Sequence, residues 1–212
     1  MALTNVLVSE PTLVPTPTAL PVVLNTANLP ITLTFKGDIA TTFPQAAGLY
    51  TSPIYTVDLI QDATITSLNS TATATALTPI SILETVTMDF GTVAGGTNAG
   101  TVIMNTAGAR SVTGDGQFIT TGPGLPGSFQ ITGEPNVTYA VLITGPAILE
   151  NAGGQQITAN AFTNNSLGTL PGTGIETFQV GATLNLGPLQ SAGTYSTVTG
   201  AGAAFVVTVN YN

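Results

Sequence analysis

The stretch Met88-Asp89-Phe90-Gly91-Thr92-Val93-Ala94-Gly95-Gly96 decides how the rest of the chain is interpreted. It closes an apolar run that begins near residue 80, and glycine supplies backbone conformations that a strand does not hold. We therefore expect one strand over residues 80–93, bent at Gly91 and ended by the two glycines. Short apolar runs between glycine turns continue to the C-terminus, and this pattern predicts an almost wholly β protein.

Beyond this stretch, strand-like segments recur at a spacing of roughly 8 to 12 residues, which is typical of sandwiches and barrels. The last segment is the clearest, because one face of a strand would carry Phe205, Val207 and Val209 into the core. No window repeats apolar residues at helical spacing. We expect an antiparallel β-sandwich with an extended N-terminal arm. Its other predicted strands cover residues 31–36, 50–60, 63–68, 72–77, 101–105, 117–121, 127–132, 138–144, 156–162 and 176–186.

The composition excludes several classes of function. The chain is 43% hydrophobic and 6% charged, so its surface must consist mainly of uncharged polar residues. Ten acidic residues stand against two basic ones, Lys36 and Arg110, and nucleic acid or anionic lipid partners are therefore not expected. Cysteine and histidine are absent, which excludes disulfides, thiolate or imidazole metal sites and imidazole-dependent triads. We expect no enzymatic activity, no cofactor and no metal.

The N-terminal residues differ from the rest of the chain. Residues 2–9 form an apolar run without a local partner, and its candidate buried side chains are Leu3, Val6, Leu7 and Val8. Four prolines follow, which lack amide donors and favour an extended linker of about 3.1 Å per residue: Pro11, Pro15, Pro17 and Pro21. We expect residues 1–29 to be a donor-strand arm with its linker, and residues 30–212 to be a single sandwich domain.

Isolated carboxylates permit three chemical interpretations. Asp89 precedes Phe90-Gly91 as in the metal-binding triplet of kinases, but no phosphate loop or catalytic loop accompanies it, so we expect Asp89 to be a surface residue or a partner for backbone amides in a bend. Glu134 and Glu150 could form a glycosidase pair, although such a site needs a sugar cleft that a chain without tryptophan does not indicate. Calcium could be bound by acids that form no closed loop in the sequence, namely Asp58, Asp62, Asp115 and Glu150.

Six motifs follow one another from residue 72 onward. They are Ala-Thr-Ala-Thr-Ala-Leu-Thr-Pro-Ile-Ser-Ile (72–82), Met-Asp-Phe-Gly-Thr-Val (88–93), Ser-Phe-Gln-Ile-Thr-Gly (128–133), Phe-Gln-Val-Gly-Ala-Thr-Leu (178–184), Gly-Thr-Tyr-Ser (193–196) and Val-Thr-Val-Asn-Tyr (207–211). In this order they resemble a bacterial secreted, pilin-like β-sandwich domain family of unknown function. The resemblance covers residues 72–212, implies an extracellular sandwich of the pilin-like or immunoglobulin-like jelly-roll type, and brings no catalytic residues with it.

The N-terminal residues depart from that family pattern, and we expect this protein's own function to lie there. A detached apolar strand before a stiff linker favours a structural subunit of an extracellular, pilus-like filament, which polymerises head-to-tail by donating this strand to another copy of itself. The alternatives are a secreted binding module, such as an adhesin or carbohydrate-binding sandwich, and a viral or phage structural protein. No apolar stretch predicts a membrane span, and residues 1–5 lack signal-peptide features, so a signal would have been removed or export would use another route.

Overall fold

A computed structural model describes residues 5–9, 46–51, 55–61, 64–119 and 124–212. Every regular element in these residues is a β-strand, and all strand ladders are antiparallel. The all-β, antiparallel fold class predicted from the sequence is confirmed. The expected strand over residues 31–36 and the four linker prolines lie outside the described residues.

The chain divides into two compact units, which we call unit 1 (Met1–Thr78) and unit 2 (Pro79–Asn212). The boundary expected at residues 29 and 30, between an N-terminal arm and a single domain, lies outside the described residues. The strands before residue 78 pair among themselves, and only four residues separate the last of them from the first strand of unit 2. The boundary follows from strand pairing rather than from a change in linker composition.

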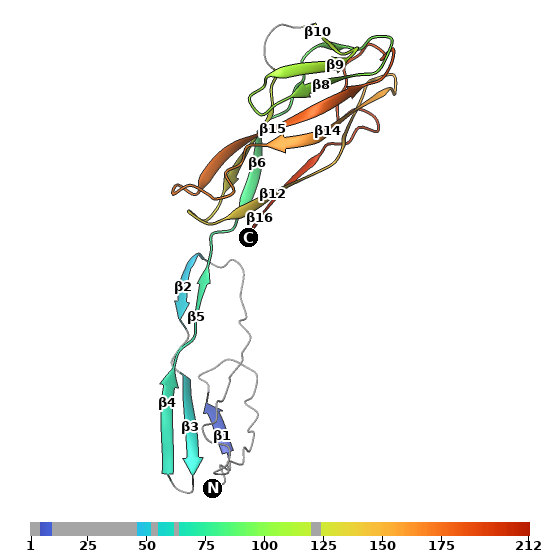
Figure 1. Ribbon diagram of the computed structural model, residues 1–212. Helices are drawn as coiled ribbons and strands as arrows, with labels where there is room; N and C mark the ends of the chain where they lie inside the picture. The colour runs from blue at the N-terminus through green and yellow to red at the C-terminus, as the bar shows by residue number, and fades with distance from the viewer. Residues whose placement is uncertain (1–4, 10–45, 52–54, 62–63, 120–123) are drawn as a thin grey trace, which may run out of the picture. The chain divides into compact units, whose positions relative to one another are not determined.

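Unit 1 contains two small sheets (Figure 1). In the first, β3 is paired on one side with β1 and on the other with β4, and in the second β2 pairs with β5. The bounds are β1 (Asn5–Ser9), β2 (Gly48–Thr51), β3 (Tyr55–Gln61), β4 (Thr64–Ser70) and β5 (Thr73–Ala76). The N-terminal segment, which was expected to find its partner in a neighbouring chain, thus lies beside β3 of its own chain, with Val6 opposite Leu59.

Unit 2 is built around its longest strand, β15 (Ile175–Leu186). One edge of β15 pairs with β14, while the other edge is shared by β11 over residues 175–180 and by β8 over residues 182–186. The sheet has the order β13-β14-β15-β11-β6, and β9 extends it beside β8 (Figure 1). The bounds are β6 (Ser81–Val86), β8 (Gly100–Met104), β9 (Arg110–Gly114), β11 (Gly127–Thr132), β13 (Ala147–Glu150) and β14 (Gln156–Asn164).

The single strand expected over residues 80–93 is divided in the structure. β6 ends at Val86, and a separate short strand, β7 (Val93–Ala94), pairs with β10 (Gln117–Phe118). Between them the Asp89 carboxylate accepts a hydrogen bond of 2.7 Å from the Gly91 amide, which closes a bend. The expected role of Asp89 as a partner for a backbone amide is confirmed, and the bend explains why the strand does not continue.

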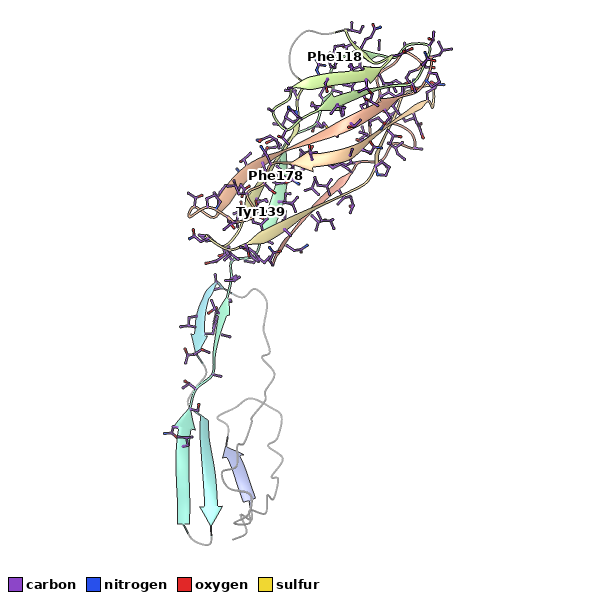
Figure 2. The ribbon with its side chains drawn as sticks, viewed as in Figure 1. Phe118, Tyr139 and Phe178 are labelled. Carbon is purple, nitrogen blue, oxygen red and sulfur yellow. The ribbon has the colours of Figure 1, made fainter. Side chains whose placement is uncertain are left out.

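A second layer covers part of the main sheet. It consists of the antiparallel pair β12 (Tyr139–Thr144) and β16 (Val206–Tyr211). Their inner side chains join those of β11 and β15 in one apolar cluster, whose buried members are Phe129, Ile131, Tyr139, Leu170, Phe178, Val180 and Val209. Figure 2 shows Tyr139 and Phe178 close together within this part of unit 2. Two sheets packed face to face over a shared core form a β-sandwich.

Candidate assembly groove

Several strands of unit 2 pair on one edge only among the described residues, and two of them lie near each other, β6 and β16. In the main sheet, β6 is the terminal strand and pairs only with β11, and in the second layer β16 pairs only with β12. The two strands approach each other, with some Cα atoms within 8 Å, but no ladder joins them. A strand paired to both edges needs them about 9.6 Å apart, so an additional strand fits only where β6 and β16 diverge beyond this close approach.

A cavity of about 280 Å³ lies between these strands and the sheet beneath them. Its walls include Ile82 of β6 and Val207 of β16, together with Phe205 just before β16. Phe129 and Phe162 line it from β11 and β14. Except for Phe129, these five side chains are only half-buried, so their apolar surface lies in a groove that is open to solvent and not in a sealed core.

Aromatic rings form much of this surface. The Phe162 and Phe205 rings are stacked with centroids 4.5 Å apart, and Phe205 meets Phe129 edge-on at 6.2 Å. Phe129 in turn stacks on the buried Phe178 at 5.7 Å. Such ring pairs hold one another in place and are worth about 0.5 to 1.5 kcal/mol beyond their burial. The groove is therefore supported by a chain of rings that reaches the centre of unit 2.

The two edge strands run in opposite directions, and one end of the space between them is closed. The Tyr211 hydroxyl, at the end of β16, accepts a 2.5 Å hydrogen bond from the Glu134 amide, just after β11 ends. The start of β6 pairs with that end of β11, with Ser81 opposite Thr132. A side chain at Gly133 would collide with the Tyr211 hydroxyl, so glycine is required for this closure. A strand bound between β6 and β16 must be parallel to one and antiparallel to the other.

A buried tyrosine–carboxylate pair lies in the core beneath the second layer. The Tyr139 hydroxyl donates a 2.6 Å hydrogen bond to Glu176 Oε2, and the Leu167 amide donates one of 2.8 Å to Glu176 Oε1. Burial, followed by the hydrogen bond to Glu176, raises the pKa of Tyr139 from 10.0 to about 12. Both Glu176 carboxylate oxygens thus accept a hydrogen bond. We interpret the pair as structural, because it fixes β12 against β15.

The proposed glycosidase carboxylates lie too far apart to act on one bond. Glu134 follows β11 next to the start of β15, where Gly133 is hydrogen-bonded to Gly174. Glu150 ends β13 near the other end of β15 and accepts a 2.7 Å hydrogen bond from the Gln156 side chain. The two positions lie at opposite ends of the 12-residue β15, which at about 3.3 Å per residue spans roughly 40 Å, whereas glycosidase pairs lie about 5 to 9.5 Å apart.

Asp115, one of the candidate calcium ligands, also has a structural role. Asp115 Oδ2 accepts hydrogen bonds from the Asn98 amide at 2.8 Å and from the Asn98 side chain at 3.2 Å, which ties a turn to the end of β9. In the described parts of the chain, no three acidic side chains gather as a metal site would require. Asp62 lies outside the described residues. The described residues of the chain contain no helix long and apolar enough to cross a membrane.

The predicted assembly residues fall in different places. Val6, Leu7 and Val8 belong to β1, and Leu3 lies outside the described residues together with Pro11, Pro15, Pro17 and Pro21. Phe205 and Val207 line the groove, and Val209 is buried beneath it with 8% of its surface exposed. Sequence reasoning did not identify Phe129 and Phe162, although each stands in a predicted strand, because nothing local shows that both strands border the same space.

Comparison with known families places this chain in one of them. The chain belongs to the family described as Domain of unknown function (DUF4402), whose model matches residues 80–211 and so covers nearly all of unit 2. No curated protein and no solved structure shows significant similarity to the chain. The match agrees with the predicted family of unknown function, and it leaves unit 1 outside the family domain.

Proposed function

We propose that this protein is the structural subunit of an extracellular filament, in which each copy donates its N-terminal strand to the next. The observation that carries this proposal is the groove beside the edges of β6 and β16, which has aromatic walls with polar residues such as Glu84 and Thr197 among them and which no described strand of the chain fills. A strand in that groove would form backbone ladders and bury apolar side chains at the same time. The groove is the acceptor.

The donor is the apolar segment of residues 2–9. Burial of Leu3, Val6, Leu7 and Val8 would contribute about 6 to 10 kcal/mol before the cost of ordering the segment and docking the subunits. Within one chain β1 pairs with β3, so donation exchanges this ladder for the groove of another copy. Because every subunit gives one strand and receives one, the exchange repeats along a fibre.

The geometry of donor and acceptor favours an open fibre over a closed dimer. The donor segment belongs to unit 1 and the acceptor groove to unit 2, so the two contacting surfaces differ. Contacts between unlike surfaces close on themselves only in special geometries and otherwise generate helical polymers. The proposal includes a bacterial, secreted and pilin-like character for the family domain. This bacterial, secreted and pilin-like character is supported by the sandwich fold, by the low charge and by the motif order of residues 72–212.

Negative-stain electron microscopy of the purified full-length chain tests this function directly. We expect filaments, and we expect a chain lacking residues 1–10 to remain folded but monomeric. A synthetic peptide of residues 1–10 should then raise the melting temperature of the shortened chain. Filaments of the shortened chain would exclude the N-terminal strand as donor. A full-length chain that stays monomeric and binds a ligand would instead favour a secreted binding module.

A further inference from the structure

The outward faces of the two edge strands carry unexpected apolar side chains. Leu83 of β6 is 65% exposed and lies opposite Gln130 of β11, and Val206 of β16 is 56% exposed and lies opposite Thr144 of β12. Both therefore point away from the core of unit 2, next to polar residues. Each stands on a strand whose other edge borders the groove. Other exposed apolar residues occur in the described chain, and these two are distinguished by their position on the strands that border the unfilled space.

A strand bound between β6 and β16 would have two distinct faces. Side chains alternate across a strand, so every second one would point inward to Phe129, Phe162 and Phe205. The remaining side chains would point outward, where one could lie opposite Leu83 and another, further along the strand, opposite Val206, at the distance of about 4.5 to 5.5 Å at which directly opposed side chains interact. The groove thus offers apolar contacts on both sides of the bound strand.

We infer that the groove selects a strand that is apolar on both faces, and that the occupant is residues 2–9 of a second copy; this inference rests on the proposed function. In an extended segment Leu3 and Leu7 share one face, and Val6 and Val8 share the other. The outward face of β16 is polar at Thr208 and Asn210 and apolar only at Val206. The N-terminal segment matches the groove because it carries aliphatic side chains on both faces.

The test compares two pairs of surface substitutions in the full-length chain. The first pair, Leu83→Ser with Val206→Ser, removes the outward contacts beside the groove. The second pair, Leu142→Ser with Val198→Ser, is the matched control: Leu142 is 58% exposed on β12, one strand away from the groove edge, and Val198 is 91% exposed. Because all four side chains point to solvent, both variants should keep the melting profile of the unaltered chain.

The readouts are the critical concentration for polymerisation, measured by sedimentation, and the affinity of the full-length chain for a fluorescent peptide of residues 1–10. We expect the first variant to raise the critical concentration and to weaken peptide binding roughly 2- to 30-fold, and the control to change neither. Equal values for the first variant and the control would overturn the two-faced site while leaving the filament proposal intact.

The peptide measurement separates this inference from the proposed function. If the unaltered chain does not polymerise but binds the peptide, and the binding weakens only in the first variant, the filament proposal fails and the two-faced groove is supported. If the unaltered chain does not bind the peptide, the N-terminal segment is not the occupant and the inference is overturned.

Discussion

A disulfide that locks β1 onto β3 should stop filament formation, because donation requires β1 to leave that position. Val6 lies opposite Leu59 in the β1–β3 ladder, and directly opposed residues have Cβ atoms about 4.5 to 5.5 Å apart, near the reach of a disulfide. The chain has no cysteine of its own, so Val6→Cys with Leu59→Cys can form only the intended bridge within one chain. The bridge closes a loop of roughly 50 residues, which corresponds to about 4 kcal/mol of added folding stability, and while it is intact β1 cannot leave β3.

The matched control uses the same substitution at Leu59 but joins β3 to its other neighbour. Thr66 of β4 lies opposite Leu59, so Leu59→Cys with Thr66→Cys closes the β3–β4 hairpin and leaves β1 free to move. Both variants are examined by negative-stain microscopy and sedimentation, in the oxidised and the reduced state. We expect the β1–β3 variant to form filaments only after reduction, and the control to form them in both states.

Two results would contradict this reasoning. Filaments of the oxidised β1–β3 variant, with the bridge shown by mass spectrometry to lie within one chain, would mean that assembly does not use β1. Covalent ladders on a non-reducing gel would mean that β1 pairs with β3 of a neighbouring chain, which would place the acceptor in unit 1 and not in the groove of unit 2.

Three further predictions concern the stability of unit 2. Val207→Asp puts a charge into the groove wall and should either unfold unit 2 or prevent assembly; an unchanged melting temperature with normal filaments would show that this face of β16 is wrongly assigned. Phe178→Ala, at a side chain 1% exposed, should lower the free energy of unfolding by about 3 to 5 kcal/mol in a denaturant titration. The pKa of Tyr139, raised to about 12, means that its neutral form stabilises the fold fully below pH 10 and that this contribution is lost as the pH rises from 10 to 12. Tyr139→Phe should be less stable at neutral pH and should show a smaller decline over that range, and a decline equal to that of the unaltered chain would exclude Tyr139 as its source.

The strands of unit 2 were largely predictable because local signals coincide there. Period-two alternation and glycine-containing turns predicted residues 127–132, which are β11, and residues 176–186, which differ from β15 by one residue. The weaker strands were missed. β9 has only Val112 as an aliphatic residue, and β13 is a four-residue strand that directly follows a proline. Short edge strands such as these depend on their neighbours for their conformation, so their own sequences carry only a weak strand pattern.

Neither the groove nor the division into units could be predicted from local sequence patterns, because both depend on which distant strands pair. Alternation predicted the inward face of β16, but it could not show that β16 faces β6, since 119 positions separate Val206 from Val86 in the sequence numbering. The residues between β5 and β6 do not resemble a flexible linker, so no local signal marks the boundary after Thr78. Pairing between distant strands, which decides both features, is the part of a β fold that periodicity cannot supply.

The short junction between the units has a mechanical consequence. Only residues 77–80 separate β5 from β6, so tension applied to unit 1 enters unit 2 at the start of β6. The hydrogen bonds between β6 and β11 run across the strand direction, so a pull along β6 loads the ladder in shear instead of opening it bond by bond. In a fibre, a donated strand beside β6 would provide a second ladder that shares the force. Tension along the polymer would then be borne by the very strands that hold neighbouring subunits together.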